Sequence, residues 1–116
     1  MGLSHKEKTV EQRLKESAQI LIKHPDRVCV FLERQHNSLT LPIIDNNKFL
    51  VPDSLTIAQF IYIVRKRIKV SAQQGLFFYV NNSLISGSQT ILEISNKYKD
   101  VDGFLYVKYT SENCFG

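Results

Sequence analysis

Apolar side chains recur at helical spacing in two stretches of the chain. The first covers residues 10–24, and Pro25 ends it because a residue that precedes proline is pushed out of the α region. The second covers residues 57–68, and a Thr56-Ile57-Ala58-Gln59 capping box opens it. A third, shorter helix is predicted from about Thr90 to Tyr98.

Shorter apolar runs without helical spacing predict strands. These strands cover residues 28–33, 48–51, 76–80 and 104–109. An Asn81-Asn82 turn follows the third strand. Residues 34–47 are typical of a turn-rich connection, and the polar residues 1–9 predict a loose segment.

After the first helix, the order of elements is strand, strand, helix, strand, short helix, strand. This order is typical of the β-grasp fold, in which a mixed sheet wraps one long helix. We therefore expect an α+β, ubiquitin-like β-grasp fold with a mixed four-stranded sheet around helix 57–68. The expected divisions are an N-terminal helical extension (1–26), the β-grasp domain (27–109) and a flexible tail (110–116), within one globular domain.

Composition narrows the class of protein. A chain of 116 residues is large enough for one modest core. Its 43% hydrophobic content excludes disorder throughout. The sequence has no apolar run of about 18 residues and no signal-peptide core. Cys29 and Cys114 lie far apart, so we interpret them as free thiols in a reducing, cytoplasmic compartment.

The formal charge of +4 is unevenly distributed. Basic residues crowd the first quarter of the chain and form a tight cluster over residues 65–69. Such surfaces favour acidic peptides, anionic lipid or nucleic acid, and the first group is equally consistent with a solvated helix face. Nucleic acid is not expected, because neither cluster is interleaved with aromatic residues or glycines.

Catalysis is not predicted. His5, His24 and His36 have no Cys or carboxylate at metal-ligand or triad spacing, so no metal site is expected. The five glycines are scattered and form no phosphate-binding loop, and no cofactor is predicted. Cys114 lies in no prenylation box and is interpreted as a chance free thiol.

The sequence ends in Gly116, just beyond the last predicted strand. A glycine carboxylate can enter a narrow channel and be attacked without hindrance, because glycine has no Cβ. The seven residues from Thr110 to Gly116 would reach about 23–25 Å if extended. That length is sufficient to enter the active site of another protein.

Several motifs in fixed order resemble one known family, the autophagy ubiquitin-like modifiers related to GABARAP. The similarity extends from about residue 10 to residue 116, with one short insertion in the 34–47 connection. The motifs are Pro25-Asp26-Arg27-Val28, Lys48-Phe49-Leu50-Val51-Pro52, Leu55-Thr56, Gln59-Phe60, Arg65-Lys66-Arg67-Ile68, Leu76-Phe77-Phe78-Tyr79-Val80-Asn81-Asn82 and Phe104-Leu105-Tyr106-Val107.

This resemblance implies a non-enzymatic modifier. Gly116 would be activated as an adenylate, passed between cysteines of an activating and a conjugating enzyme, and joined to phosphatidylethanolamine on the autophagosome membrane. A cysteine protease in the family often trims residues beyond the glycine. Nothing follows Gly116 here, which leaves open whether the end is encoded or results from processing or truncation. The resemblance further implies a protein that is monomeric and cytoplasmic before conjugation.

The resemblance also implies two hydrophobic pockets for receptors that carry aromatic-x-x-aliphatic motifs. Residues 48–51 would form a short edge strand to which such a peptide adds. The aromatic pocket would comprise Glu16, Ile20, Cys29, Phe31, Lys48, Leu50 and Phe104. The aliphatic pocket would comprise Phe49, Val51, Pro52, Leu55, Phe60 and Ile63. Lys48 and Arg67 would contact acidic residues that flank the motif.

Some of these residues have a simpler interpretation. Phe60, Ile63 and Phe104 would be core residues in any β-grasp protein, whereas Phe49 and Leu50 on an edge strand are harder to explain as core alone.

The sequence also departs from the family pattern. Cys29 replaces a common proline and would add an oxidisable thiol to the first pocket. Ser4 and Lys8 replace an aromatic residue and a histidine, which weakens the expectation that residues 1–9 dock. The first helix is more apolar than usual in its second half, and Lys108 replaces a small residue and is expected to face solvent.

Two alternatives remain at this level. One is a ubiquitin-like adaptor in vesicle trafficking that binds the same peptides without attachment to lipid. The other is a basic β-grasp domain that binds nucleic acid or anionic membrane by charge alone. Binding by charge alone should collapse steeply between about 50 and 200 mM salt, whereas two-pocket binding should persist.

Overall fold

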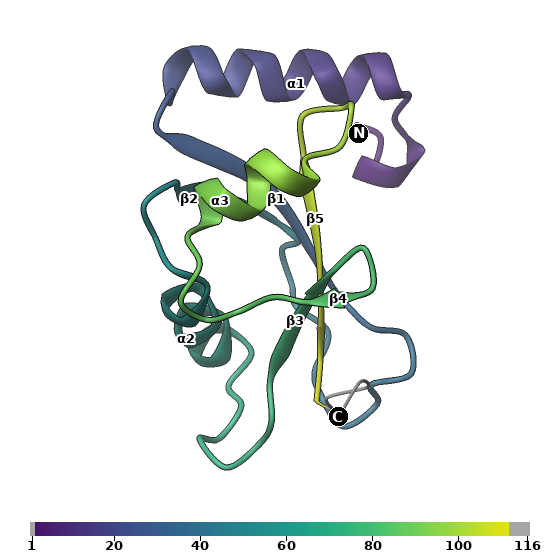
Figure 1. Cartoon of the computed structure of the whole chain (residues 1–116). Coiled ribbons are helices and arrows are strands. Elements are labelled where there is room, and N and C mark those ends of the chain that lie inside the picture. The colour runs from purple at the N-terminus through teal and green to yellow at the C-terminus, as the bar shows by residue number, and fades with distance from the viewer. Residues whose placement is uncertain (1, 112–116) are drawn as a thin grey trace.

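A computed structural model describes residues 2–111 of the chain (Figure 1). Gly116 and Cys114 therefore lie outside the described residues. The helical elements are η1 (His5–Glu7), α1 (Val10–Lys23), α2 (Ile57–Arg67) and α3 (Ile91–Tyr98). The strands are β1 (Arg27–Arg34), β2 (Lys48–Pro52), β3 (Phe77–Val80), β4 (Ser83–Leu84) and β5 (Leu105–Thr110). The structure confirms the three predicted longer helices and the four predicted strands, with small changes in their bounds.

The sheet is mixed, as predicted, but in the described part of the chain it has five strands rather than four. Their order is β2-β1-β5-β3-β4, with β1 and β5 parallel and the other neighbours antiparallel. The additional strand, β4, follows a tight turn in which Asn81 and Asn82 have φ values of 50° and 63°. The turn was predicted. The strand was missed because two residues are too few to show a period of two.

The two faces of β1 belong to different clusters. Val28, Val30 and Leu32 pack in the main core, to which α2 and α3 also contribute. Cys29 and Phe31 point to the opposite face, because side chains alternate along a strand, and they pack with Phe104 in a smaller cluster. Both faces of the strand are therefore buried.

Helix α1 lies across one end of the molecule, and β5 runs from beside α1 to the other end (Figure 1). The predicted apolar stripe of α1 is not its main contact surface, since Val10 and Leu14 are 43% and 47% exposed. Ser17 is instead buried, and its Oγ donates a hydrogen bond to the backbone oxygen of Asp102 (2.8 Å). The helix therefore packs through the small polar side chain of Ser17 and the half-buried Ile20 rather than through Val10 and Leu14.

Each of the longer helices begins with a threonine cap. Thr9, Thr56 and Thr90 each accept a hydrogen bond from the backbone N–H three residues later. These contacts satisfy N–H groups that have no partner within the helix. The capping box predicted at Thr56 is confirmed.

The connection between β1 and β2 contributes to the core. Leu41 and Ile44 are buried there, which the turn-rich sequence did not predict. Tyr109 holds the connection in place, because its hydroxyl donates to the backbone oxygen of Pro42 (2.7 Å) and accepts from the Ile44 N–H (2.9 Å). None of the described helices has the length and apolar character that a membrane span requires.

Candidate functional site

Strand β2 is an edge strand of the described sheet. It pairs with β1 in an antiparallel register that places Leu50 opposite Cys29 and Phe49 opposite Val30. Because directly opposite residues point to the same face, Leu50 lies on the Cys29 face and Phe49 on the main-core face. One short strand therefore presents side chains to two separate surfaces, as the two predicted pockets require.

The residues of the predicted aromatic pocket lie together on the α1 side of the sheet. Cys29, Phe31 and Phe104 form one buried cluster, and the half-buried Ile20 of α1 packs against it. The remaining members come from α1 (Glu16) and from β2 (Lys48 and Leu50). Leu50 is 39% exposed, so it offers apolar surface that the protein itself does not cover.

Two lysines hold Glu16 at this site. Lys8 Nζ donates to one carboxylate oxygen (2.8 Å), and Lys48 Nζ donates to the other (2.9 Å). Burial raises the pKa of Glu16, but the hydrogen bonds and charges of the two lysines outweigh burial and leave its pKa below the usual value. The carboxylate is therefore ionised at neutral pH. It competes with the acidic flanking residues of any bound peptide for contact with Lys48.

The predicted aliphatic pocket is assembled less completely. The Phe49 and Phe60 rings meet edge to face, with centroids 5.5 Å apart, and Val51 and Phe60 are buried in the main core. Leu55 packs against that core, and Pro52 is half-buried. Ile63 does not join the core and is 46% exposed, contrary to its interpretation as a core residue.

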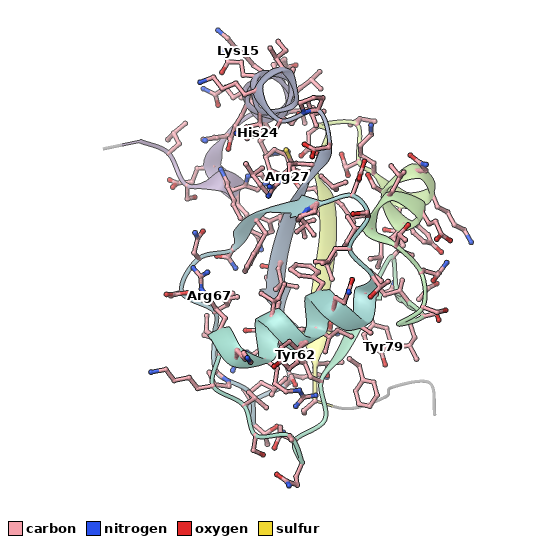
Figure 2. The ribbon with its side chains drawn as sticks, turned by 90° about the vertical axis from the view of Figure 1, so that its left-hand side faces the viewer. Lys15, His24, Arg27, Tyr62, Arg67 and Tyr79 are labelled. Atoms are coloured by element: carbon pink, nitrogen blue, oxygen red, sulfur yellow. The ribbon has the colours of Figure 1, made fainter. Side chains whose placement is uncertain are left out.

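The two candidate contacts for acidic flanking residues lie on different faces. Lys48 Nζ lies 5.8 Å from the centroid of the Phe104 ring, and the Arg67 guanidinium lies 5.6 Å from the centroid of the Phe49 ring. Arg67 also forms an exposed ion pair with Asp45 at 3.5 Å. Figure 2 shows Arg67 at one end of α2, far from Lys15 on the outer side of α1.

Cys29 is less accessible than an oxidisable pocket thiol should be. It is only 2% exposed, and burial raises its pKa. A buried thiol with a raised pKa forms little thiolate, which is the reactive species. Lys108 faces solvent, as predicted.

His5 was not among the residues expected at this site. The polar residues 1–9 predicted a loose segment, but His5 is buried and stacks on Phe31 with ring centroids 4.4 Å apart. One local signal was present in the sequence: Glu7 stands three residues after Ser4, and its carboxylate accepts a hydrogen bond from the Ser4 N–H (3.0 Å). That spacing indicates a helical turn, but it does not indicate where the turn docks.

No group of three or more His, Cys, Asp or Glu side chains within residues 2–111 is arranged to hold a metal ion.

Comparisons with known proteins show the family of this chain. The family model for "Autophagy protein Atg8 ubiquitin like" matches residues 12–116. Autophagy-related protein 8c of Arabidopsis thaliana is 46% identical over 110 residues, which cover 95% of this chain and 92% of that protein. Autophagy-related protein 8a of the same plant is 45% identical over 107 residues, which cover 92% and 87%.

A solved structure shows the same fold. The crystal structure of Trypanosoma brucei ATG8 superposes with a TM-score of 0.87 at 39% identity, covering 99% of this chain and 100% of that one. The ubiquitin-like fold, the matched family model and the curated relatives lead to one conclusion. This chain belongs to the Atg8 family of ubiquitin-like autophagy proteins.

Proposed function

We propose that this protein is conjugated through the Gly116 carboxylate to phosphatidylethanolamine on autophagosomal membranes. Once attached, it recruits receptors that carry aromatic-x-x-aliphatic motifs. The proposal keeps the division into an extension (1–26), a β-grasp domain (27–109) and a tail (110–116). It assigns no catalytic role to any residue of the chain.

The observation that carries the recruitment role is the edge strand β2 with its two-sided display. A peptide that adds to β2 as a further strand alternates its own side chains between the two faces. Its aromatic anchor meets the group around Leu50 and Phe104, and its aliphatic anchor meets the group around Phe49 and Leu55. The strand's only described strand neighbour is β1, so the outer edge is open to such a partner.

Two backbone groups on this outer edge make hydrogen bonds to side chains of the protein itself. The Lys48 N–H donates to the Asn46 side chain (3.2 Å), and the Leu50 carbonyl accepts from Arg27 Nη1 (3.4 Å). Both contacts are long and exposed, so an added strand can replace them at little cost. Lys48 and Arg67 then lie where acidic residues beside the motif gain favourable charge interactions.

The position of β5 supports conjugation through the tail. The body of the protein holds the chain as far as Ser111, whose N–H donates to Ser38 Oγ (2.9 Å). The sequence continues for five residues beyond Ser111, which span about 16–18 Å if extended. These five residues reach less far than the seven expected from the sequence, because Thr110 belongs to β5 and Ser111 is hydrogen-bonded to Ser38.

The proposal implies several partners. They are an activating and a conjugating enzyme, a cysteine protease that processes the chain or removes the lipid, receptors with the peptide motif, and the phosphatidylethanolamine membrane. The unconjugated protein is monomeric and cytoplasmic in this proposal, and the conjugated protein resides on the autophagosome.

Reconstitution tests the conjugation step. The purified chain is incubated with its cognate activating and conjugating enzymes, ATP and phosphatidylethanolamine liposomes, and the product is identified by mass spectrometry. We expect a lipid-linked product from the wild type and none from a chain that lacks Gly116, with Gly116→Ala severely impaired. If the wild type remains unmodified while the enzymes charge a control substrate, the unconjugated adaptor becomes the better description.

A further inference from the structure

His5 fills a buried site beside the aromatic pocket. Its ring stacks on Phe31 with centroids 4.4 Å apart, and it meets the edge of Phe104 at 4.6 Å. Both phenylalanines belong to the predicted pocket, and both are at least 94% buried in the presence of His5. The N-terminal segment therefore covers apolar surface that a peptide's aromatic side chain would use.

The hydrogen bonds of His5 favour one protonation state. The Tyr106 hydroxyl donates to Asp102 Oδ2, so its oxygen is free to accept from His5 Nε2–H (2.8 Å). The neutral ring then carries its proton on Nε2. His5 Nδ1 is buried and has no hydrogen-bond partner among the described residues. Protonation would place an N–H there with nothing to accept it, which is costly in a buried site.

The charges that face His5 come from several elements. Lys48 of β2 and Arg13 of α1 oppose a positive charge on the ring, whereas Glu16 of α1 and Asp102 before β5 favour it. Burial is the largest influence, and together with the two cations it lowers the pKa of His5 below its usual value. The docked segment therefore prefers neutral His5.

Ion pairs and hydrogen bonds to backbone oxygens hold the rest of the segment. Lys6 Nζ pairs with Glu33 of β1 (2.8 Å), and Lys8 Nζ pairs with Glu16 (2.8 Å). Arg13 Nη1 donates to the backbone oxygen of Lys8 (2.6 Å) and, more weakly, to that of His5 (3.4 Å). The Lys6–Glu33 pair is exposed and contributes little by itself. The Lys8–Glu16 pair and the Arg13 hydrogen bonds are partly buried, so they hold the segment together with the docked His5 ring. Among these groups, His5 is the one whose protonation the buried site opposes.

We propose that residues 4–8 form a latch over the aromatic pocket, which is closed while His5 is neutral and released when His5 is protonated. This inference rests on the proposed peptide site and adds its regulation. A peptide's aromatic side chain and the His5 ring compete for the Phe31 and Phe104 surface. Mild acidification removes the competitor and strengthens peptide binding.

The direction in which the stability of the latch changes with pH follows from the lowered pKa of His5. The released segment takes up a proton near the ordinary histidine value of 6.5, and the docked segment does so only at lower pH. The latch therefore has its full stability above that value and weakens as the pH falls through it. Each pH unit between the two pKa values weakens the latch about tenfold.

Peptide affinity provides the first test. A histidine-free aromatic-x-x-aliphatic peptide is titrated by calorimetry into the full chain at about pH 7.5 and about pH 5.5. We expect the wild type to bind roughly two- to tenfold more tightly at the lower pH. His5→Phe keeps an aromatic ring that cannot titrate, so its affinity should be equally weak at both pH values. His5→Ala should bind tightly at both.

Matched controls separate His5 from the other two histidines. His24 and His36 are both exposed, and the variants His24→Gln and His36→Gln should retain the pH response of the wild type. The proposal is overturned if the wild type and His5→Phe respond equally to pH.

Nuclear magnetic resonance of the wild type gives an independent readout that needs no variant. Contacts between the His5 ring and Phe31 should disappear as the His5 ring resonances titrate. Persistent contacts with protonated His5 would refute the release, and release without a change in affinity would refute the latch. If no variant binds peptide at either pH, the proposed peptide site fails, while the resonances still decide whether the segment opens.

Discussion

Lys48 Nζ of β2 donates a hydrogen bond to Glu16 Oε2 of α1 at 2.9 Å. This contact joins the N-terminal extension to the edge strand at the rim of the candidate peptide site. The other carboxylate oxygen of Glu16 accepts a hydrogen bond from Lys8 of the N-terminal segment. Glu16 therefore connects the N-terminal segment to the edge strand at the rim of the site. An acidic peptide must compete with Glu16 for Lys48.

Glu16→Gln should therefore strengthen the binding of peptides with acidic flanks, whereas Lys48→Ala should weaken it. We expect each change to be about 0.5–1 kcal/mol, because both groups are partly exposed. Calorimetry with peptides that have acidic or neutral flanks measures the effect. Lys108→Ala removes an exposed lysine from β5 and serves as the control. Equal losses for both peptides would exclude a charge contact at Lys48.

Leu50→Ala should abolish detectable peptide binding with little effect on stability. Leu50 is 39% exposed on edge strand β2, and Leu84 is 42% exposed on the opposite edge strand β4. Leu84→Ala is thus a matched control with similar exposure. We expect urea unfolding to show a loss of about 1 kcal/mol or less for each variant. Equal binding by the two variants would contradict the assignment of the site to β2.

Phe49→Ala combined with Leu50→Ala should cost more stability than Leu50→Ala alone, because Phe49 packs edge to face on the core residue Phe60. We expect the double variant to lose a further 1–2 kcal/mol or so of unfolding free energy while remaining folded. Circular dichroism with urea unfolding checks this. An unchanged stability would mean that Phe49 is not part of the core.

Asp102→Asn should destabilise the protein by about 2–4 kcal/mol at neutral pH. The Asp102 side chain is 1% exposed, and Arg13 Nε donates to it at 2.9 Å. Burial raises the pKa of Asp102, but hydrogen bonds from Tyr106, the Phe104 N–H and Arg13 outweigh burial and lower it. The stability that it contributes is therefore present above the ordinary pKa of 3.8 and is lost as the pH falls through the lowered value.

Urea unfolding of the wild type and of Asp102→Asn at neutral and acidic pH measures this effect. The difference between the two proteins should narrow as the pH falls. Asp26→Asn, at an exposed position, should change stability little at either pH. A constant difference across the pH range would show that ionised Asp102 is not its source.

Gly103→Ala should destabilise the packing of α1 by about 2–4 kcal/mol. Gly103 has a φ of 85°, and a Cβ there would lie 2.2 Å from Ser17 Oγ. Adding Ser17→Gly should recover part of the loss, because it removes the clash but not the backbone strain. Gly2→Ala is the control, since a Cβ at Gly2 meets nothing within 4 Å. Thermal unfolding of the wild type, Gly103→Ala, the double variant and Gly2→Ala measures how much of the stability loss comes from the clash.

The elements and their order could be predicted because their signals are local. The capping box at Thr56, the apolar stripe of α2 and the runs of β1 and β5 each lie within one stretch of sequence. The family motifs extended this prediction to an edge strand at β2, and the sheet order confirmed it. These motifs also grouped the side chains around Leu50, which the structure brings together.

The sequence by itself therefore determined the β-grasp order, the family and the edge position of β2. Only the tertiary structure decided which side of α1 faces the sheet, since Ser17 is buried by Asp102 and Gly103, 85 and 86 positions later. The tertiary structure likewise decided that His5 docks on Phe31 and on Tyr106. Tyr106 lies 101 positions after His5 in the sequence. Such contacts depend on surfaces that exist only after the chain has folded, and no local period encodes them.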